Sequence, residues 1–134
     1  MIVAGSAWTS DQVDYSYLID GSDPDFSAWE FDLTFFTRVG DQTAASDDYG
    51  TNCTVTPSYL LRKAWADGGV VVDDADAGIV HFALTAADTE TIRRALGRDV
   101  WKPRLLTIQL RRTDTDEPQH IQFFNEMFVP GGGA

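Results

Sequence analysis

The segment Trp29-Glu30-Phe31-Asp32-Leu33-Thr34-Phe35-Phe36 decides the fold class, because apolar and polar side chains alternate along most of it. One set consists of large apolar residues: Trp29, Phe31, Leu33 and Phe35. Alternation with a period of two is typical of a strand that buries one face. The pattern ends at Thr37-Arg38-Val39-Gly40. We therefore predict a strand over residues 29–36.

The remainder of the amino-terminal half holds weaker patterns. Val13, Tyr15, Tyr17 and Ile19 alternate with other residues, which predicts a strand that stops at the Asp- and Gly-rich turn 20–24. Residues 41–56 are polar and irregular, and they fit a loop or a ragged edge strand. Residues 59–65 fit either a short strand or a helical turn.

The carboxy-terminal half predicts two hairpins and one helix. Residues 70–72 and 79–84 are rich in β-branched side chains and flank an Asp/Gly turn, as in a β-hairpin. Thr85 and Asp88 have the spacing of a capping box and Gly97 is a typical helix stop, so we predict a helix of about three turns between them. Its inner side should carry Ile92 and Leu96. A closing hairpin follows, with alternating apolar residues in its arms at Leu106, Ile108 and Leu110, and at Ile121, Phe123, Met127 and Val129.

Short strands separated by turns, with one short helix, predict an all-β fold: an antiparallel β-sandwich. The length of 134 residues is typical of one domain, so we expect a single sandwich domain over residues 1–129. Residues 130–134 are Pro-Gly-Gly-Gly-Ala, where we expect a flexible tail.

The charge of the chain disfavours several classes of partner. It has 21 acidic and 10 basic side chains, and a formal net charge of -11. A nucleic-acid-binding protein gains affinity by neutralising phosphates with Lys and Arg, and anionic membranes also attract basic segments. We therefore expect no nucleic acid and no membrane as partner. The start of the chain has no evident signal peptide, and no run is long and apolar enough for a membrane span.

Two groups of aspartates could bind a metal ion, but neither has a complete set of ligands. The groups are Asp73, Asp74 and Asp76 in one turn, and Asp20, Asp23 and Asp25 in another. A calcium loop needs a carboxylate at about the twelfth position from its first ligand, and neither group has one there. We interpret both groups as solvated turn residues, and predict no metal and no cofactor.

A catalytic site is also weakly indicated. Cys53 is the single cysteine, so it cannot form a disulfide within the chain, and no base lies near it in sequence. His81 and His120 stand in predicted strands without a nucleophile motif. An enzyme would have to use Asp and Glu pairs, and no spacing singles out such a pair. We predict that the chain is not an enzyme.

Aromatic residues are numerous for a small core, with four Trp, four Tyr and eight Phe. Phe124 and Phe128 fall on the second face of the last predicted strand, opposite Phe123 and Met127. A strand that is apolar on both faces is either covered within the fold or docked on a partner, and aromatic residues are enriched at interface centres.

Our candidate interface consists of Phe124 and Phe128, with Arg111 and His120 beside them. On this hypothesis, replacing the two phenylalanines by serine leaves folding largely intact and abolishes assembly. If the substitutions unfold the protein instead, the two rings belong to the core.

Several of these segments occur together, and in the same order, in one known family. They are Ala4-Gly5-Ser6-Ala7-Trp8, the turn 20–24, the segment 31–38, the Gly68-Gly69 hairpin with Ala77-Gly78 in its turn, and Ala83-Leu84-Thr85-Ala86-Ala87-Asp88-Thr89. In this order, and with a closing hairpin over 105–129, the chain resembles the immunoglobulin-like amino-terminal domain of phage baseplate upper proteins and many small structural proteins of tailed phages. The resemblance spans nearly the whole chain. The longer polar segment 41–56 and Glu30-Phe31-Asp32 depart from the family pattern.

The resemblance implies an immunoglobulin-like sandwich that acts as a noncatalytic virion structural protein of a tailed phage. It would be an adaptor or anchoring domain in a tail, baseplate, neck or fibre assembly. Its partners would be other phage structural proteins and further copies of itself in a symmetric assembly. It would be made in the host cytoplasm and located in the virion.

Other functions remain open from the sequence. A carbohydrate- or receptor-binding module would use exposed Trp and Asp residues on loops. A head decoration protein would have the same fold with a different place in the particle. A hydrolase would need two carboxylates held together in a cleft.

Overall fold

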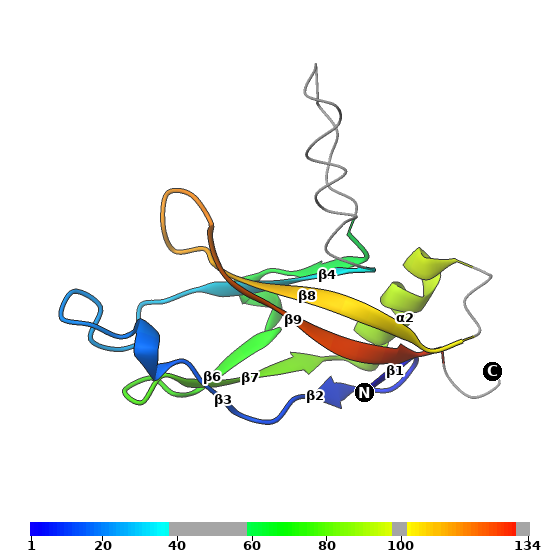
Figure 1. Cartoon of the computed structure of the whole chain (residues 1–134), viewed down its shortest axis with the longest axis horizontal. Coiled ribbons are helices and arrows are strands. Elements are labelled where there is room, and N and C mark those ends of the chain that lie inside the picture. Colours follow the sequence, from blue (N-terminus) through cyan, green and yellow to red (C-terminus); the bar gives the residue numbers. More distant parts are fainter. Residues whose placement is uncertain (38–58, 98–101, 131–134) are drawn as a thin grey trace, which may run out of the picture.

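Two β-sheets pack face to face in the computed structural model, which describes residues 1–37, 59–97 and 102–130. Figure 1 shows the larger sheet above the smaller one. The large sheet has the strand order β1-β9-β8-β4-β5. These strands are β1 (Ile2–Val3), β9 (Gln119–Val129), β8 (Arg104–Arg112), β4 (Phe31–Phe36) and β5 (Leu61–Lys63). The pairing is antiparallel except between β1 and β9.

The small sheet is built around β7 (Ile79–Leu84). Along one edge β7 pairs with β2 (Trp8–Thr9) and β3 (Val13–Asp14), and along the other with β6 (Val70–Asp74). Both predicted hairpins, β6–β7 and β8–β9, are therefore confirmed. So is the all-β sandwich with one short helix.

The helix α2 (Ala86–Leu96) lies at one end of the sandwich and forms as its capping residues predict. The amide of Asp88 donates to Thr85 Oγ1 at 3.1 Å, and the amide of Thr85 donates to Asp88 Oδ2 at 2.8 Å. At the other end the amide of Gly97 donates to two carbonyl oxygens of the last turn. Ile92 is fully buried and joins the core of the sandwich.

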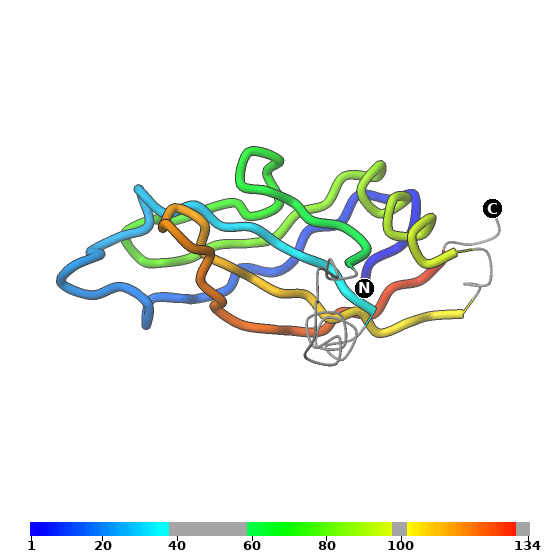
Figure 2. Tube along the Cα trace, turned by 90° about the horizontal axis from the view of Figure 1, so that it is seen from above, coloured from blue at the N-terminus to red at the C-terminus, as the bar shows by residue number. Residues whose placement is uncertain are grey.

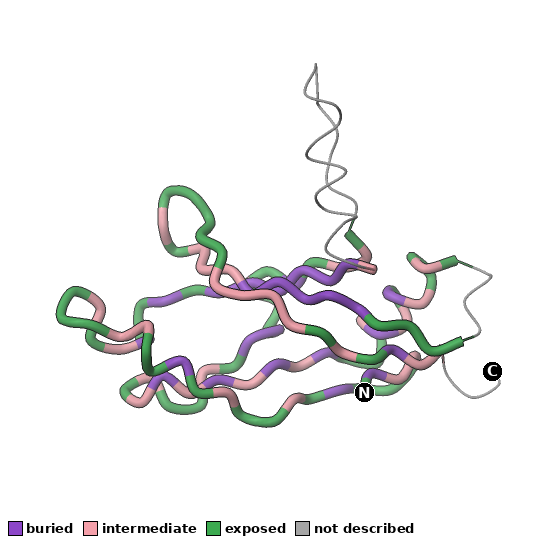
Figure 3. The backbone as a smooth tube through the Cα atoms, in the orientation of Figure 1, coloured by how far each residue is buried: buried purple, intermediate pink, exposed green. Residues whose placement is uncertain are grey.

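The core lies between the two sheets, and its composition follows the alternation in the sequence. Phe31, Leu33 and Phe35 of β4 are at most 1% exposed, and they pack with Val80, Phe82 and Leu84 of β7 in one cluster. Figure 3 shows the buried positions concentrated along the strands, while the turns at both ends are mostly exposed. The view from above in Figure 2 shows β4 and β8 side by side in the middle of the large sheet.

The predicted strand over residues 13–19 is wrong beyond Asp14. The chain instead forms a short 3-10 helix, η1 (Ser16–Leu18). Asp14 Oδ1 accepts a hydrogen bond from the amide of Ser16 at 2.8 Å, and the amide of Leu18 donates to the carbonyl of Tyr15. Aspartate favours such local bonds over a strand ladder, so the strand ends there.

The segment 59–65, which fitted either a strand or a helical turn, contains both. Strand β5 is followed by another 3-10 helix, η3 (Trp65–Asp67). The predicted strand at 29–36 begins at Phe31, and Trp29 is buried before it. Residues 41–56 with Cys53, as well as Trp101 and residues 131–134 of the predicted tail, lie outside the described residues.

Candidate functional site

The four residues of the predicted interface lie on two opposite faces of the large sheet. Phe124 pairs with Ile108 of the core and stacks on Phe82 of the small sheet, with ring centroids 5.0 Å apart. Phe128 is fully buried in the core cluster. Both phenylalanines therefore face the core, and the prediction that Phe128 offers a contact surface is wrong.

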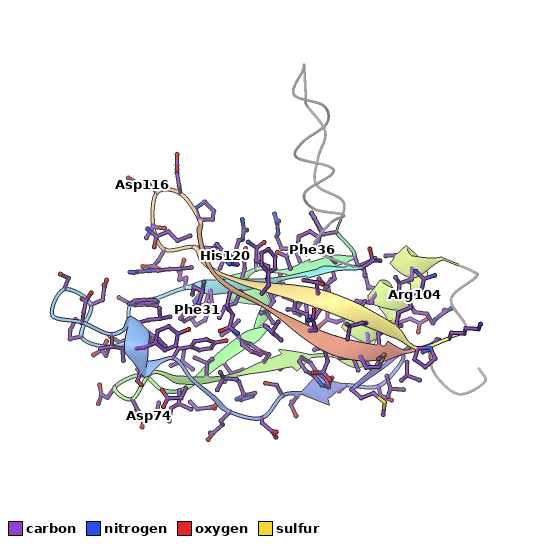
Figure 4. All side chains as sticks on the ribbon, viewed as in Figure 1. Phe31, Phe36, Asp74, Arg104, Asp116 and His120 are labelled. Atoms are coloured by element: carbon purple, nitrogen blue, oxygen red, sulfur yellow. The ribbon has the colours of Figure 1, made fainter. Side chains whose placement is uncertain are left out.

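Arg111 and His120 occupy the other face, which looks away from the small sheet. They stand opposite each other in the β8–β9 pair, and residues directly opposite in an antiparallel pair share a face. Arg111 also pairs with Asp32 of β4. We call this face the large outer face. Figure 4 shows His120 on this side of the sheet.

A β-bulge explains why the sequence pattern assigned the aromatic residues to the wrong faces. The register of β8 and β9 shifts between Leu110 and Arg111, which leaves Ile121 as an extra residue in β9. Ile121 packs against the core, and so does Phe124. Strict alternation would place Ile121 and Phe123 together, but one inserted residue reverses the faces that follow it. Phe123 and Met127 are thus the residues on the large outer face.

The large outer face consists of cross-strand rows that run from a charged end to an apolar end. From the registers of β5, β4, β8 and β9, the first row is Asp32, Arg111 and His120. The second is Arg62, Thr34, Gln109 and Phe123, the third is Phe36, Thr107 and Asn125, and the last is Leu105 and Met127.

An ion pair fixes the charged end. Arg111 donates two hydrogen bonds to the carboxylate of Asp32, at 2.9 and 2.5 Å. Asp32 is 4% exposed, and its hydrogen bonds raise the pKa of Arg111 above its ordinary value. A bidentate pair of this kind holds the guanidinium in one orientation.

Hydrogen bonds also organise the middle of the face. Gln109 Nε2 lies 3.1 Å from His120 Nδ1, and the His120 ring lies against Phe123 with centroids 4.6 Å apart. Thr107 donates to Asn125 at 3.2 Å. Four polar side chains of β4 and β8 are buried on this outer face: Asp32, Thr34, Thr107 and Gln109. Their positions are therefore set before any partner arrives.

The apolar end is open to solvent. Leu105 and Met127 stand directly opposite each other in the register, and they are 54% and 40% exposed. Among the described residues these are two of only six large apolar side chains that are exposed. The sequence did contain a signal for this end, since Leu105 precedes the polar series Thr107, Gln109 and Arg111 on the same side of β8.

A second polar cluster holds together loops at one end of the sandwich. The guanidinium of Arg112 lies 3.7 Å from the centroid of the Trp29 ring and donates two hydrogen bonds to Asp114, both at 2.8 Å. It also reaches Asp23 at 3.3 Å. Arg112 holds the pKa of Asp114 below its ordinary value, and Asp114 in turn accepts from the amide of Glu30. This arrangement connects the loop before β4 to the closing hairpin.

The candidates for catalysis and ligand binding are not assembled into a site in the described part of the chain. His81 Nδ1 lies 2.8 Å from Asp73 Oδ2 on the outer side of the small sheet, and no nucleophile of the described residues is in hydrogen-bond contact with it. Trp8 and Trp29, which a sugar-binding module would expose, are buried. A hollow of about 560 Å³ is lined by described residues of the closing hairpin's turn alone, residues 115–119.

Within residues 1–37, 59–97 and 102–130, no group of three or more His, Cys, Asp or Glu side chains could hold a metal ion. In the same part of the chain, no helix is long and apolar enough to span a membrane.

Comparison with known proteins gives no family assignment: the chain matches no protein-family model and no curated protein.

Proposed function

We propose that this chain is a noncatalytic structural domain of a tailed-phage virion, and that it docks on other virion proteins through the large outer face. The observation that carries the docking is the exposed Leu105–Met127 pair beside side chains that are already hydrogen-bonded in place. An interface gains affinity from apolar contact and loses some of it when mobile side chains must be ordered on binding. Side chains that are already held by hydrogen bonds reduce this entropic cost and so favour binding.

The place in a virion is supported by the order of the sequence motifs, which resembles immunoglobulin-like structural proteins of tailed phages. The β-sandwich is compatible with this proposal, and an immunoglobulin-like topology belongs to the proposal as well. A symmetric assembly presents each contact many times, so a small exposed apolar area per copy is sufficient.

Deletion and complementation in a phage that encodes the chain tests this function. We expect the deletion to stop the production of complete particles. The wild-type chain should restore complete particles and be detected in them, after purification, by mass spectrometry. The Met127→Asp variant should fold but should not be incorporated into the particles. Tyr17→Asp is the matched control, since Tyr17 is 68% exposed and lies in η1, away from the large outer face.

Two results would contradict the proposal. One is a deletion that leaves infectious particles of unchanged composition. The other is a folded Met127→Asp variant that enters the particles as efficiently as wild type. Partial particles would reveal the site of action: empty heads without tails indicate a neck or tail role, and unstable heads indicate decoration.

A further inference from the structure

The outer faces of the two sheets carry charges of opposite sign. The strands of the small sheet contain three aspartates, Asp14, Asp73 and Asp74, and no lysine or arginine. Among the described strand residues, the large outer face contains Arg62 and Arg111 but a single acid, Asp32, which is buried. In a chain with a net charge of -11, a face whose described residues include more basic than acidic side chains stands out.

On the large outer face, Arg62 supplies the positive charge that is not neutralised by a carboxylate of that face. Its Nε donates to Thr34 at 3.0 Å, and its guanidinium lies 4.6 Å from the centroid of the Tyr59 ring. Neither Thr34 nor Tyr59 is charged, so the guanidinium is held in position while its charge stays available for a carboxylate of a partner. The exposed pair Leu105 and Met127 lies on the same face.

The corresponding face of the small sheet is acidic around an apolar centre. We call it the small outer face. Val71 is 37% exposed and pairs with His81, and Asp73 contacts His81 from the next position along β6 on this side. Asp14 and Asp74 both pair with Ile79 at one end of the face. Figure 4 shows Asp74 on the side of the molecule opposite His120.

We propose that the partner of the large outer face is a second copy of this chain, which presents its small outer face. The contact is heterologous: Leu105 and Met127 of one copy meet the Val71 region of the next, and Arg62 meets aspartates. This inference rests on the proposed function, in which the large outer face docks on protein, and it names that protein.

Charge decides between this contact and a two-fold one. Two large outer faces would oppose arginine to arginine, and two small outer faces would oppose aspartate to aspartate, which costs energy. Opposite faces of one molecule are complementary, and repeated head-to-tail contacts build a ring or a stack.

The net charge does not prevent such a contact. Many of the acids stand in turns at the ends of the sandwich, such as Asp20, Asp23, Asp25, Asp116 and Glu117. At about 0.15 M salt, exposed charges farther apart than roughly 8 Å are largely screened.

Sedimentation velocity of the purified chain over a concentration series tests the proposal. We expect wild type to form dimers and larger species as the concentration rises. Met127→Asp places an acid against the acidic face, and Val71→Lys places a base against the basic face. Each variant alone should therefore associate at least about tenfold more weakly.

An equimolar mixture of the two variants is the decisive sample. Each variant retains the face that the other needs, and the altered faces bring Asp and Lys together, so the mixture should recover association. Tyr17→Asp should behave as wild type. Circular dichroism and unfolding midpoints verify folding, and Leu105→Asp with Thr9→Lys provides a second pair on the same two faces.

Three results would overturn the inference: a wild type that stays monomeric at every concentration, a Val71→Lys variant that associates normally alone, or a mixture that does not recover. The second result would indicate a two-fold contact. None of them affects the particle-assembly experiment, where the large outer face could still dock on a different protein. Failure of that experiment with intact self-association would instead reject the virion role alone.

Discussion

Phe123 and Phe128 belong to the same strand, β9, but their rings lie on opposite faces of the large sheet. Phe128 is fully buried between the sheets, whereas Phe123 lies on the large outer face against His120. A fully buried ring contributes to stability through transfer from water and through close packing. Assembly and stability should therefore separate at these two positions.

Replacement of each phenylalanine by alanine tests this difference. Phe128→Ala should lower the free energy of unfolding by about 3–5 kcal/mol, because it leaves a cavity in the core. Phe123→Ala should cost clearly less, since its ring is partly exposed in the native state. Urea denaturation monitored by circular dichroism measures both values. Equal, small losses would show that Phe128 is not part of the core.

At the scale of elements, charged side chains connect segments that the sheets alone do not hold. Lys63 of β5 lies 2.7 Å from Asp88 of α2, and both side chains are largely buried. Burial alone would raise the pKa of Asp88, but hydrogen bonds from Lys63 and from Thr85 outweigh it, so the pKa lies below its ordinary value. The same carboxylate thus caps the helix and docks it on the large sheet.

The lowered pKa of Asp88 has a consequence for stability in acid. Because its folded-state pKa lies below the unfolded value of about 3.9, the carboxylate contributes stability above that pH and loses it as the pH falls through the folded-state pKa. Asp88→Asn should lower the urea midpoint at pH 7, and the difference from wild type should shrink below about pH 4. Asp11→Asn, at an exposed position, is the control. A constant difference from pH 7 to 3 would contradict the assignment.

Arg112 connects the loop before β4 to the closing hairpin, and its geometry requires arginine. Arg112→Lys keeps the charge but loses the two-pronged bonds to Asp114 and the stacking on Trp29. We expect a loss of about 1–3 kcal/mol in urea denaturation, with faster hydrogen exchange in residues 20–30. Arg94→Lys on the exposed side of α2 should have little effect. If both substitutions are equally mild, Arg112 does not hold the loop.

Local rules predicted the elements well where neighbouring residues determine them. The β4 strand, the Thr85–Asp88 capping box and the β6–β7 turn each depend on residues close in sequence, and each is confirmed. The expectation that β4 buries only one face is wrong, because all six of its residues are buried. The strand predicted over residues 13–19 is wrong beyond Asp14, because the Asp14 side chain accepts a local backbone hydrogen bond that competes with strand pairing.

The candidate site was less predictable, since it depends on pairing between strands. Arg111 and His120, both part of the predicted interface, stand opposite each other, but the bulge at Ile121 changes which aromatic side chains share their face. A bulge has no reliable signal in a single strand's sequence. The charge difference between the two outer faces likewise emerges only when strands distant in sequence are assigned to sheets.

At the scale of the whole molecule, the two outer faces of the sandwich differ in charge, and the turns at its ends are rich in acidic residues. Its core is apolar, its large outer face carries arginines and the Leu105–Met127 pair, and its small outer face carries aspartates around Val71. Among the described residues, most of the acids therefore lie in the turns and in the small sheet. A molecule of this kind can be soluble and still present an apolar contact surface.

Hydroxyl-radical footprinting read by mass spectrometry tests the docking surface most directly. Methionine oxidises readily when exposed, so Met127 reports on the large outer face, and exposed Met1 and Tyr17 provide reference sites in the same chain. The oxidation rate of Met127 should fall severalfold when the chain is assembled, in particles or in its own oligomers, while that of Tyr17 stays unchanged. A Met127 that oxidises equally fast in the assembled and the free chain would contradict docking through this face.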